Sequence, residues 1–318
     1  MFTRILGTGA YLPEQVRTNF DLEKMVETSD EWIVERTGIR ERRIATEEET
    51  ASFMGAAAAR QAIENANLKA TDIDAVICAT TSGKYAFPSS ACEICRSLGI
   101  SNVPAFDVAA ACAGFSYAYA VAHSMILTGQ AKNVLIVGSD RMSHACDPAD
   151  RTTIILFGDG AGAFVLGSSD IEGTMAVHLA SDPNFADLLK LQIPPRSGVG
   201  ENNSYLIMKG NEVFRHAVTI LSKLVTQVLE KAQVSADDLD YLVPHQANLR
   251  IIAATARKLK LDMSQVVVTL DKQGNTSSAS IPLAMHQGIS EGKIKRGDLC
   301  LLESFGGGFA WGAALVKY

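Results

Sequence analysis

The chain carries the same order of helix, acidic turn and strand twice. Residue patterns predict amphipathic helices at Ser52–Ala66 and at Val213–Ala232, where apolar side chains recur at helical spacing in the second. Each helix is followed by similar residues: ATDIDAVI begins at Ala70 and ADDLDYLV begins at Ala236. Helices that alternate with short apolar runs are typical of α/β layers, so the repeat predicts two similar α/β halves in one chain.

The predicted strands can be matched between the halves. In the first half they are Ala75–Ala79, Val103–Val108, Val134–Gly138 and Ala161–Leu166. In the second half they are Tyr241–Val243, Val266–Leu270, Leu299–Leu302 and Ala313–Val316. Val103 stands nine residues before Cys112, and Val266 stands nine residues before Asn275. Equivalent loops of two packed halves would meet, so this spacing predicts that Cys112 and Asn275 share one site.

These matches set the expected division of the chain. We expect an N-terminal half over residues 1–170 and a C-terminal half over residues 171–318. The first half also contains an insertion, residues 139–153, that the second half lacks. A long irregular insertion beside a site is typical of a binding or interface element.

Charge and hydropathy exclude several classes of protein. The net charge is −6, which argues against binding of nucleic acid through overall charge. No window of about 18 residues is free of charges and turn formers, so insertion into a membrane is not expected. The first residues show no signal region followed by a cleavage site, and we therefore expect a cytoplasmic location.

The six cysteines are spaced irregularly, which favours free thiols over a disulfide framework. Cys92 and Cys95 form a C-x-x-C pair, a spacing that occurs in metal and redox sites. No second pair and no histidine cluster accompanies them, and residues 91–98 have the pattern of a helix. We expect a structural role for this pair and no bound metal.

One cysteine stands apart because of its neighbours. The stretch AAACAGF, residues 109–115, places Cys112 between a predicted strand and a predicted helix, among small side chains. The positive end of a helix dipole favours a thiolate, and thiol pKa values at such positions can fall to about 3.5–7.5. The segment alone fits either an activated nucleophile or a buried cysteine packed among alanines.

Several motifs together resemble those of the β-ketoacyl-acyl-carrier-protein synthase III family. They are AAACAGF around Cys112, VPHQAN at residues 243–248, GNT at 274–276, FGGGF at 305–309, and TSDEWI at 28–33 with RTGI at 36–39. They stand in the family's order, and the resemblance runs from the first strand of the chain to its last residue. It implies a thiolase-like fold, in which two duplicated α/β halves form α-β-α-β-α layers.

The resemblance also implies a reaction. The family catalyses the first condensation of fatty-acid synthesis, in which an acyl-CoA primer and malonyl-acyl carrier protein give 3-oxoacyl-acyl carrier protein, CO2 and CoA. The partners that it implies are acyl-CoA, acyl carrier protein and a second copy of the chain in a homodimer. The CoA thioester is a substrate, and no cofactor is expected.

The family's catalytic residues fall on Cys112, His245 and Asn275. Cys112 would carry the acyl group as a thioester, and the backbone N–H groups of Cys112 and Gly307 would form the oxyanion hole. His245 and Asn275 would donate hydrogen bonds to the enolate that forms when malonyl loses CO2. Without the family, His245 fits a satisfied histidine in a turn, and Asn275 fits turn chemistry after Gly274.

Asn275 separates this chain from related enzymes. Elongating condensing enzymes have a second histidine at this position, and thiolases, which do not decarboxylate, add a second cysteine in a C-terminal glycine-rich segment. Residues 305–308 contain no cysteine, and Cys300 stands too far upstream. The Cys–His–Asn set therefore favours a decarboxylating enzyme that starts from a primer.

Three residues are expected at a CoA site. The resemblance implies that adenine stacks between Trp32 and Arg151, with Arg36 near the phosphates. On their own, Trp32 and Arg36 fit one face of an amphipathic helix. Thr152 departs from the glycine expected in close relatives, and its Cβ narrows the backbone conformations available at the rim of the site.

A cationic surface is expected to receive the acidic carrier protein. The resemblance places its contacts at Gln246, Ala247, Asn248, Leu249, Arg250 and Arg215. Residues 248–260 have the pattern of a helix, on which Arg250 and Arg257 lie seven residues apart and so on one face. Without the family, this surface also fits a solvated basic face.

The length of the primer depends on residues in loops. Phe87 matches a family position that reaches across the dimer to close the neighbouring acyl pocket, and Met142 is expected nearby in the insertion. A bulky ring there predicts a short pocket for acetyl or propionyl. The alternatives that remain are a condensing enzyme for longer or branched primers or for a specialised pathway, a silent partner subunit, and a Cys–His–Asn acyl hydrolase.

Overall fold

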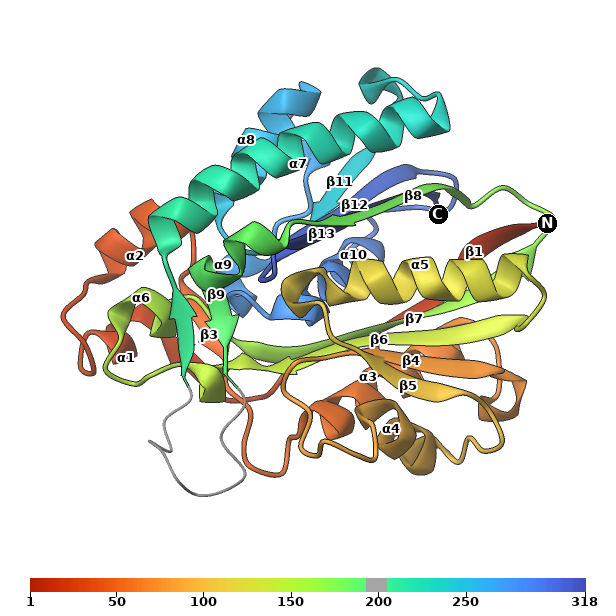
Figure 1. Ribbon diagram of the computed structural model, residues 1–318, viewed down its shortest axis with the longest axis horizontal. Helices are drawn as coiled ribbons and strands as arrows, with labels where there is room; N and C mark the ends of the chain where they lie inside the picture. Colours follow the sequence, from red (N-terminus) through yellow and green to blue (C-terminus); the bar gives the residue numbers. More distant parts are fainter. Residues whose placement is uncertain (193–204) are drawn as a thin grey trace.

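The computed structural model describes residues 1–192 and 205–318, which form two similar sheets separated by helices (Figure 1). The strands of the first sheet are, in spatial order, β1 (Phe2–Tyr11), β7 (Asp159–Ser169), β6 (Asn133–Arg141), β4 (Ala75–Ala79) and β5 (Ala105–Val108). Those of the second sheet are β8 (Thr174–Ser181), β13 (Ala310–Lys317), β12 (Leu299–Gly306) and β11 (Tyr241–Pro244). The boundary placed after residue 170 falls in the connection between β7 and β8.

The two sheets have the same strand order and the same strand directions. In the first, β1–β7 and β7–β6 are antiparallel, and β6–β4 and β4–β5 are parallel. In the second, β8–β13 and β13–β12 are antiparallel, and β12–β11 is parallel. The internal duplication that the sequence predicts is therefore confirmed.

The second sheet differs from the first at the place of β5. There, in the part of the chain that the structure describes, Val266 makes one isolated parallel bridge to Leu242. The predicted strand Val266–Leu270 is wrong, because Leu270 already begins the short helix α9 (Leu270–Gln273). The apolar run is buried like a strand, and a run this short does not distinguish a strand from a buried turn and helix start.

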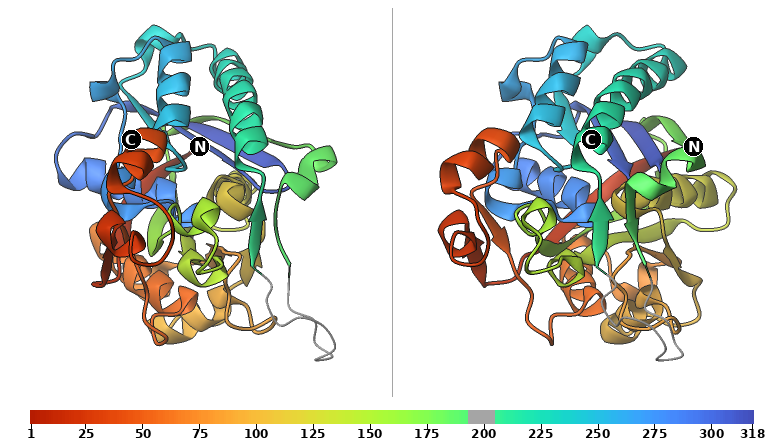
Figure 2. Two further views of the ribbon diagram at one scale, coloured as in Figure 1. Left: turned by 90° about the vertical axis from the view of Figure 1, so that its left-hand side faces the viewer. Right: turned by 60° about the vertical axis from the view of Figure 1, so that its left-hand side comes forward.

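Helices form three layers around the two sheets (Figures 1 and 2). The layers contain α3 (Ala51–Asn65) and α4 (Ser90–Leu98) outside the first sheet, α5 (Gly114–Leu127) and α10 (Ser280–Ser290) between the sheets, and α7 (Gly210–Ala232) and α8 (Leu249–Leu259) outside the second sheet. The order is α-β-α-β-α, the thiolase-like architecture that the resemblance implies. None of the described helices is both long and apolar enough to cross a membrane.

Apolar side chains fill the space between these layers. In the central core, Phe115 of α5 and Phe164 of β7 pack edge to face, with ring centroids 4.9 Å apart. Two further cores join the outer helices to the outer faces of the sheets. The small side chains of Ala58, Ala59 and Ala62 are fully buried and let α3 approach its sheet closely.

The two central helices begin in the same way. The 3-10 turn η2 (Ala111–Ala113) leads directly into α5, and the 3-10 turn η7 (Ser277–Ala279) leads directly into α10. Each turn starts with a non-glycine residue at positive φ, 47° at Ala111 and 54° at Ser277. Such residues are uncommon, so their shared position marks the two turns as equivalent.

This geometry makes Ser278, and not Asn275, the counterpart of Cys112. The predicted pairing of Cys112 with Asn275 by residue counting is wrong, because α9 adds residues between Val266 and the second turn. The Ser278 hydroxyl lies 2.7 Å from Oδ2 of Asp140 and 2.8 Å from the Ala79 carbonyl oxygen. In the second half, this position therefore joins the two halves instead of facing a cavity.

The first half contains a longer connection than the second, but its bounds differ from the predicted 139–153, because residues 139–141 still belong to β6. Residues 142–158 connect β6 to β7, whereas residues 307–309 connect β12 to β13. The insertion contains the 3-10 turn η3 (Met142–Ala145) and the helix α6 (Arg151–Ile154). The carboxylate of Asp150 caps α6 by accepting from the Thr152 N–H at 2.9 Å.

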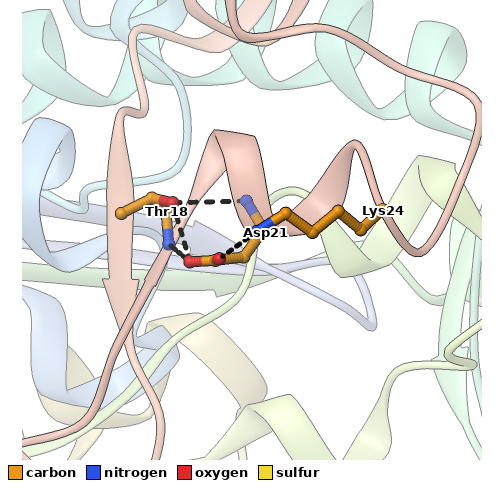
Figure 3. A network of polar contacts seen from close by, with 3 residues as sticks. All are labelled: Thr18, Asp21 and Lys24. Atoms are coloured by element: carbon orange, nitrogen blue, oxygen red, sulfur yellow. Dashed lines mark hydrogen bonds and ion pairs between the residues drawn. The ribbon is translucent and has the colours of Figure 1, made fainter.

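Shorter elements complete the fold. They are β2 (Val16–Thr18), β3 (Glu41–Arg43), β9 (Leu189–Leu191), β10 (Leu206–Met208), α1 (Asn19–Leu22), α2 (Asp30–Thr37), η1 (Ala70–Asp72), η4 (Pro183–Leu188), η5 (Ala236–Asp238) and η6 (Met263–Gln265). Thr18 and Asp21 form a capping box at α1: Thr18 Oγ1 accepts from the Asp21 N–H at 3.2 Å, and Asp21 Oδ2 accepts from the Thr18 N–H at 3.0 Å (Figure 3). Lys24 adds an exposed ion pair to Asp21 at 3.4 Å. The cap fixes the chain direction shortly before α2, the helix that carries Trp32.

Candidate active site

Cys112 lies in η2, where β5 passes into α5, and the predicted strand-to-helix junction is confirmed. Its side chain is buried and borders a cavity of about 460 Å³. His245 and Asn275 border the same cavity, as does Phe305. The structure thus brings the three residues expected to perform the chemistry to one cavity.

Burial raises the pKa of the Cys112 thiol to about 11. A hydrogen bond with Ser277 lowers this pKa in part, and the charge of Asp140 raises it. This direction is opposite to the lowered pKa that the helix start predicts, because removal from water disfavours the charged thiolate. Cys112 is therefore a thiol at neutral pH, and its proton has to leave during acyl transfer.

His245 directly follows β11 and is held at two points. Its backbone N–H donates to the carbonyl oxygen of Glu303 at 2.7 Å, and its Nδ1 lies 2.6 Å from Oγ of Ser280. Burial lowers the pKa of the imidazole to about 4, so the ring is neutral at physiological pH. Because Nδ1 is engaged, Nε2 is the ring nitrogen that can meet a substrate in the cavity.

Asn275 is held by backbone bonds to the segment before β7. It forms an isolated parallel bridge with Phe157, in which its N–H donates to Leu156 at 2.8 Å and its carbonyl accepts from Gly158 at 3.0 Å. Its side-chain oxygen accepts from the N–H of Ser277 at 2.9 Å. The oxygen is thereby occupied, so the amide nitrogen Nδ2 is the donor available to the cavity.

One glycine of the C-terminal loop lies against the backbone of Cys112. A Cβ built on Gly306 would lie 2.7 Å from the Cys112 nitrogen, a distance that excludes any side chain. A Cβ built on Gly307 would instead lie 2.9 Å from the carbonyl oxygen of Leu189 in β9. The close contact with Cys112 therefore falls on Gly306, and the oxyanion role expected of Gly307 stays a prediction.

Trp32, Arg36 and Arg151 come together at the exposed end of the cavity. The guanidinium carbons of Arg36 and Arg151 each lie 5.1 Å from the centroid of the Trp32 ring. Nη1 of Arg151 also donates to the carbonyl oxygen of Glu27 at 2.8 Å. The residues expected to bind CoA thus lie around one aromatic platform that opens toward Cys112.

Gln246 does not lie on a surface that a carrier protein could reach. Its side chain is 1% exposed, and its Nε2 donates to the carbonyl oxygens of Pro244 at 2.8 Å and Val267 at 3.0 Å. Its Oε1 accepts from the N–H of Thr269 at 2.8 Å. The predicted contact with the carrier protein is wrong, because these bonds use the amide to join β11 to the segment before α9.

The other residues expected to contact the carrier protein lie around the start of α8 and on α7. They are Ala247, Asn248 and Leu249, which are half-buried, and Arg250 and Arg215, which are exposed. Asn248 caps α8 by accepting from the Arg250 N–H at 2.9 Å, and it donates to the Arg36 carbonyl oxygen at 2.9 Å. The start of α8 is thereby joined to α2, beside which it lies (Figure 2).

Neither residue expected in the acyl pocket borders the cavity of this chain. Met142 is buried in the same apolar core as Ile155 and Phe157, which do border the cavity. The acyl pocket is expected to be completed by a second copy of the chain, so the place of Met142 in that pocket stays a prediction. Phe87 is 85% exposed, and a single chain does not test its expected contact with a second copy.

Two serines of the site were not expected from the sequence. Ser277 contacts Cys112 and Asn275, and Ser280 contacts His245. Both belong to GNTSSAS, residues 274–280, in which four of the five residues after Asn275 carry a hydroxyl group. This density of small polar residues at the start of an apolar helix is the signal that could have indicated them.

Glu303 is a fully buried carboxyl group whose backbone is bonded to His245. Within the described residues, its Oε2 has no hydrogen-bond partner. Burial raises the pKa of this carboxyl group to about 8, so it is protonated and uncharged at neutral pH. A neutral buried acid lowers the free energy of unfolding as the pH rises above its ordinary pKa. A neutral buried histidine lowers it as the pH falls below its ordinary pKa.

We expect Glu303→Gln to stabilise the protein increasingly as pH rises above 4.5, the ordinary pKa of a glutamate. Between this value and about 8, the unfolded chain is deprotonated and the folded chain is not, which weakens the native state by about 1.4 kcal/mol per pH unit. Urea unfolding at pH 7.5 should show a gain on the order of 3 kcal/mol that is nearly absent at pH 4.5. The control Glu48→Gln, at an exposed glutamate, should show no gain in stability at either pH. A gain for Glu303→Gln that is the same at both pH values would refute the conclusion that Glu303 is a neutral buried acid.

Two duplicated sheets, with a buried cysteine at a helix start and a neutral histidine and an asparagine on the same cavity, define a thiolase-like condensing enzyme. Two family models match the chain: 3-oxoacyl-[acyl-carrier-protein (ACP)] synthase III over residues 106–183, and the C-terminal region of the same synthase over residues 229–318. The chain belongs to the β-ketoacyl-[acyl-carrier-protein] synthase III family.

Relatives match over their whole length. The chain is 57% identical over 318 residues to β-ketoacyl-[acyl-carrier-protein] synthase III 1 of Vibrio vulnificus (strain YJ016), with 100% of both chains covered. The solved 3-oxoacyl-[acyl-carrier-protein] synthase III from Aquifex aeolicus VF5 is 47% identical, with a TM-score of 0.94 over 99% of this chain and 100% of that one. The corresponding structure from Pseudomonas aeruginosa PAO1 is 40% identical, with a TM-score of 0.95 over 100% and 98%.

Proposed function

We propose that this chain catalyses the decarboxylative Claisen condensation that begins fatty-acid synthesis. An acyl-CoA primer and malonyl-acyl carrier protein would give 3-oxoacyl-acyl carrier protein, CO2 and CoA. The observation that carries the proposal is that Cys112, His245 and Asn275 border one cavity, which extends to Trp32 and Arg151 at its exposed end. A nucleophile, two neutral donors and a platform for CoA are the parts that this reaction needs.

In the first step, the sulfur of Cys112 attacks the thioester carbonyl of the primer. A C–S bond to Cys112 forms, the C–S bond to CoA breaks, and the thiol proton passes to the sulfur of CoA. The backbone N–H of Cys112, beside Gly306, is suited to stabilise the oxyanion of the tetrahedral intermediate. The thiol pKa of about 11 means that the proton is still on sulfur when the primer arrives.

In the second step, malonyl loses CO2, and the electron pair of the broken C–C bond forms an enolate. We propose that Nε2 of His245 and Nδ2 of Asn275 donate hydrogen bonds to the enolate oxygen. The pKa of about 4 keeps His245 uncharged, so both donors act without a change of protonation. The enolate carbon then attacks the acyl group on Cys112, and the released thiolate takes up a proton.

Binding of CoA would require Arg151 to move off Trp32. An adenine ring between two stacking partners needs about 7 Å between their planes, whereas the Arg151 guanidinium carbon lies 5.1 Å from the Trp32 centroid. The hydrogen bond from Arg151 to the carbonyl of Glu27 is the contact that this movement would break. Arg36, on the same platform, is placed to meet the phosphates.

Reversing the charge at Arg250 should weaken the use of malonyl-acyl carrier protein and spare acetyl transfer from acetyl-CoA. Arg250 is exposed at the start of α8, and its guanidinium lies 5.1 Å from the ring of Phe214, so it can meet an acidic partner. For Arg250→Glu, we expect KM for the carrier protein to rise about tenfold at low salt, with a smaller rise at high salt.

The matched control for this charge reversal is Arg60→Glu. Arg60 is an exposed arginine on α3, in the helix layer on the opposite side of the molecule (Figure 1). It should leave both half-reactions unchanged. Equal losses of acetyl transfer and carrier-protein use in Arg250→Glu would contradict a docking role.

We further propose acetyl-CoA as the primer, a homodimer as the working form, and catalysis in the cytoplasm without a bound cofactor. The exposed Phe87 ring is the feature that supports the dimer, since contact with a second copy would bury it. The same ring would then shorten the acyl site of its neighbour. The chemistry assigned to Cys112, His245 and Asn275 uses protein groups alone.

A condensing enzyme of a specialised pathway is the second candidate, with a longer or branched primer as the alternative to acetyl. The observation that favours a specialised pathway is the likeness to a solved priming β-ketosynthase from the R1128 polyketide biosynthetic pathway, which is 37% identical with a TM-score of 0.95 over 99% of this chain and 96% of that one. A series of acyl-CoA substrates of increasing length separates the candidates. A rate that peaks at acetyl supports the first, and a peak at longer or branched chains supports the second.

One assay tests the proposed function. The protein is incubated with acetyl-CoA and malonyl-acyl carrier protein, while CO2 release and the mass of the carrier-bound product are followed. We expect CO2 and acetoacetyl carrier protein in equal amounts. CO2 release without a heavier product, or hydrolysis of acetyl-CoA alone, would contradict the condensation.

A further inference from the structure

The first residue of α10 contacts the histidine of the site. Ser280 is 1% exposed, and its Oγ lies 2.6 Å from Nδ1 of His245. It closes the segment Asn275–Ser280, which begins with the second donor of the cavity and includes Ser277 beside Cys112. One short stretch of chain therefore contacts all three residues that the proposed function uses.

The direction of the Ser280–His245 hydrogen bond follows from the surroundings of the hydroxyl group. Across residues 1–192 and 205–318, the Oγ of Ser280 has no other hydrogen-bond partner. If Nδ1–H donated to Oγ, the hydroxyl proton would be buried without an acceptor, which costs about 1–3 kcal/mol. If the hydroxyl donates to Nδ1, the hydroxyl proton has an acceptor, the ring proton lies on Nε2, and the oxygen loses only acceptor capacity.

The direction of the Ser280–His245 hydrogen bond decides whether Nε2 presents a proton or a lone pair to the cavity. The imidazole is neutral, so it carries one N–H in total. A proton on Nδ1 would leave a lone pair on Nε2, which would repel the negative oxygen of an enolate. A proton on Nε2 makes that nitrogen a hydrogen-bond donor, in parallel with Nδ2 of Asn275.

We propose that Ser280 is a positioning residue that holds His245 in the tautomer with its proton on Nε2. Ser280 touches no substrate and acts through His245 alone. The inference rests on the proposed function, because it explains why His245 serves as a hydrogen-bond donor to the malonyl thioester and not as a base. Ser280 would be the fourth side chain on which the reaction depends, because it makes Nε2 of His245 the donor in the hydrogen bond to the malonyl thioester.

The tautomer can be observed directly. Long-range proton–nitrogen correlation spectra distinguish protonated from unprotonated ring nitrogens, and His245→Gln assigns its signal among the six histidines. We expect the wild-type protein to show a protonated Nε2 and an unprotonated Nδ1 from pH 6 to 8. Ser280→Ala should show a mixture of the two tautomers, and Ser280→Cys, which keeps a weak donor, should lie between them. A wild-type ring protonated on Nδ1 would overturn the proposal, whatever the variants do.

The kinetic test separates positioning from general damage. In Ser280→Ala, we expect malonyl decarboxylation to fall about 10- to 100-fold, while transfer of acetyl from acetyl-CoA to Cys112 changes less than about twofold. Ser280→Cys should recover part of the loss. The matched control Ser290→Ala removes an exposed hydroxyl at the other end of α10 and should change neither step.

The outcomes distinguish this inference from the proposed function. An equal fall of both steps in Ser280→Ala, or no fall in decarboxylation, overturns the positioning role while the condensation stands. A wild-type protein that does not decarboxylate malonyl-acyl carrier protein overturns the proposed function. In that case the spectra still decide which nitrogen of His245 carries the proton.

Discussion

Cys112→Ser should abolish transfer of the primer to the protein and retain decarboxylation of malonyl-acyl carrier protein. A serine hydroxyl is a much weaker nucleophile than a thiol at this position, so acyl transfer should fall about 10³-fold or more. His245 and Asn275 do not depend on the sulfur for their own hydrogen bonds, so the enolate donors remain in place. Intact-mass spectrometry after incubation with acetyl-CoA measures the first step, and CO2 release measures the second.

The control for this change is Cys92→Ser, the same chemical substitution at an exposed cysteine of α4. It should acylate and condense like the wild-type protein. Full condensation activity in Cys112→Ser would remove the basis of the proposed mechanism. Loss of both steps would mean that the sulfur also supports the enolate site, contrary to the division of roles proposed for this cavity.

His245→Ala should give the complementary result. Decarboxylation should fall about 10²- to 10³-fold, the range expected when one fixed donor to an oxyanion is removed. Acetylation of Cys112 should continue, because the sulfur and the backbone N–H beside Gly306 are unchanged. Single-turnover experiments with the acetylated protein and malonyl-acyl carrier protein isolate the step that is lost.

A histidine outside the cavity provides the comparison. His144 is exposed in η3, and His144→Ala should leave decarboxylation unchanged. The wild-type rate should also be nearly constant from pH 6 to 8, because the pKa of His245 is about 4 and the ring stays neutral throughout. A wild-type rate that follows a group titrating near pH 6.5, and loses this dependence in His245→Ala, would contradict a neutral donor.

Much of the fold could be predicted from periodicity. The strand Ala75–Ala79 has the predicted bounds, and the predicted helix Ser52–Ala66 differs from α3 by one residue at each end. The strand is a continuous apolar run and the helix has a continuous apolar face, and each of these patterns is typical of the structure that it forms. Strand β1 was not predicted, because its apolar residues are interrupted by threonines and glycines that the sheet buries, and strand β8 was not, because its short apolar run is interrupted by His178 and is mostly half-buried.

Counting residues between motifs was less reliable. It paired Cys112 with Asn275, whereas the left-handed residues Ala111 and Ser277 show that Ser278 is the counterpart. A four-residue helix such as α9 leaves little periodicity in a sequence, so its addition to one half could not be seen. The two positions still reach one cavity, because Asn275 is clamped to the segment before β7.

Burial explains the other wrong predictions at the site. A glutamine beside a catalytic histidine looks like a polar surface residue, yet the Gln246 amide is bonded to four separate backbone groups in the interior. Similarly, a helix start predicts a lowered thiol pKa, whereas burial raises the pKa of the Cys112 thiol. Sequence patterns report which residues are polar, and they do not report how much water surrounds them.

The buried position of Ser278 limits how many acyl groups one chain can hold. Duplication supplies two equivalent helix starts; Cys112 at the first borders the cavity of about 460 Å³, and Ser278 at the second is not among the described residues that line it. The hydroxyl at the other start is bonded to Asp140 of the first half, so a cysteine placed there would meet a carboxylate instead of a thioester. Labelled acyl groups should therefore saturate at one per chain, even though the backbone contains two copies of the same junction.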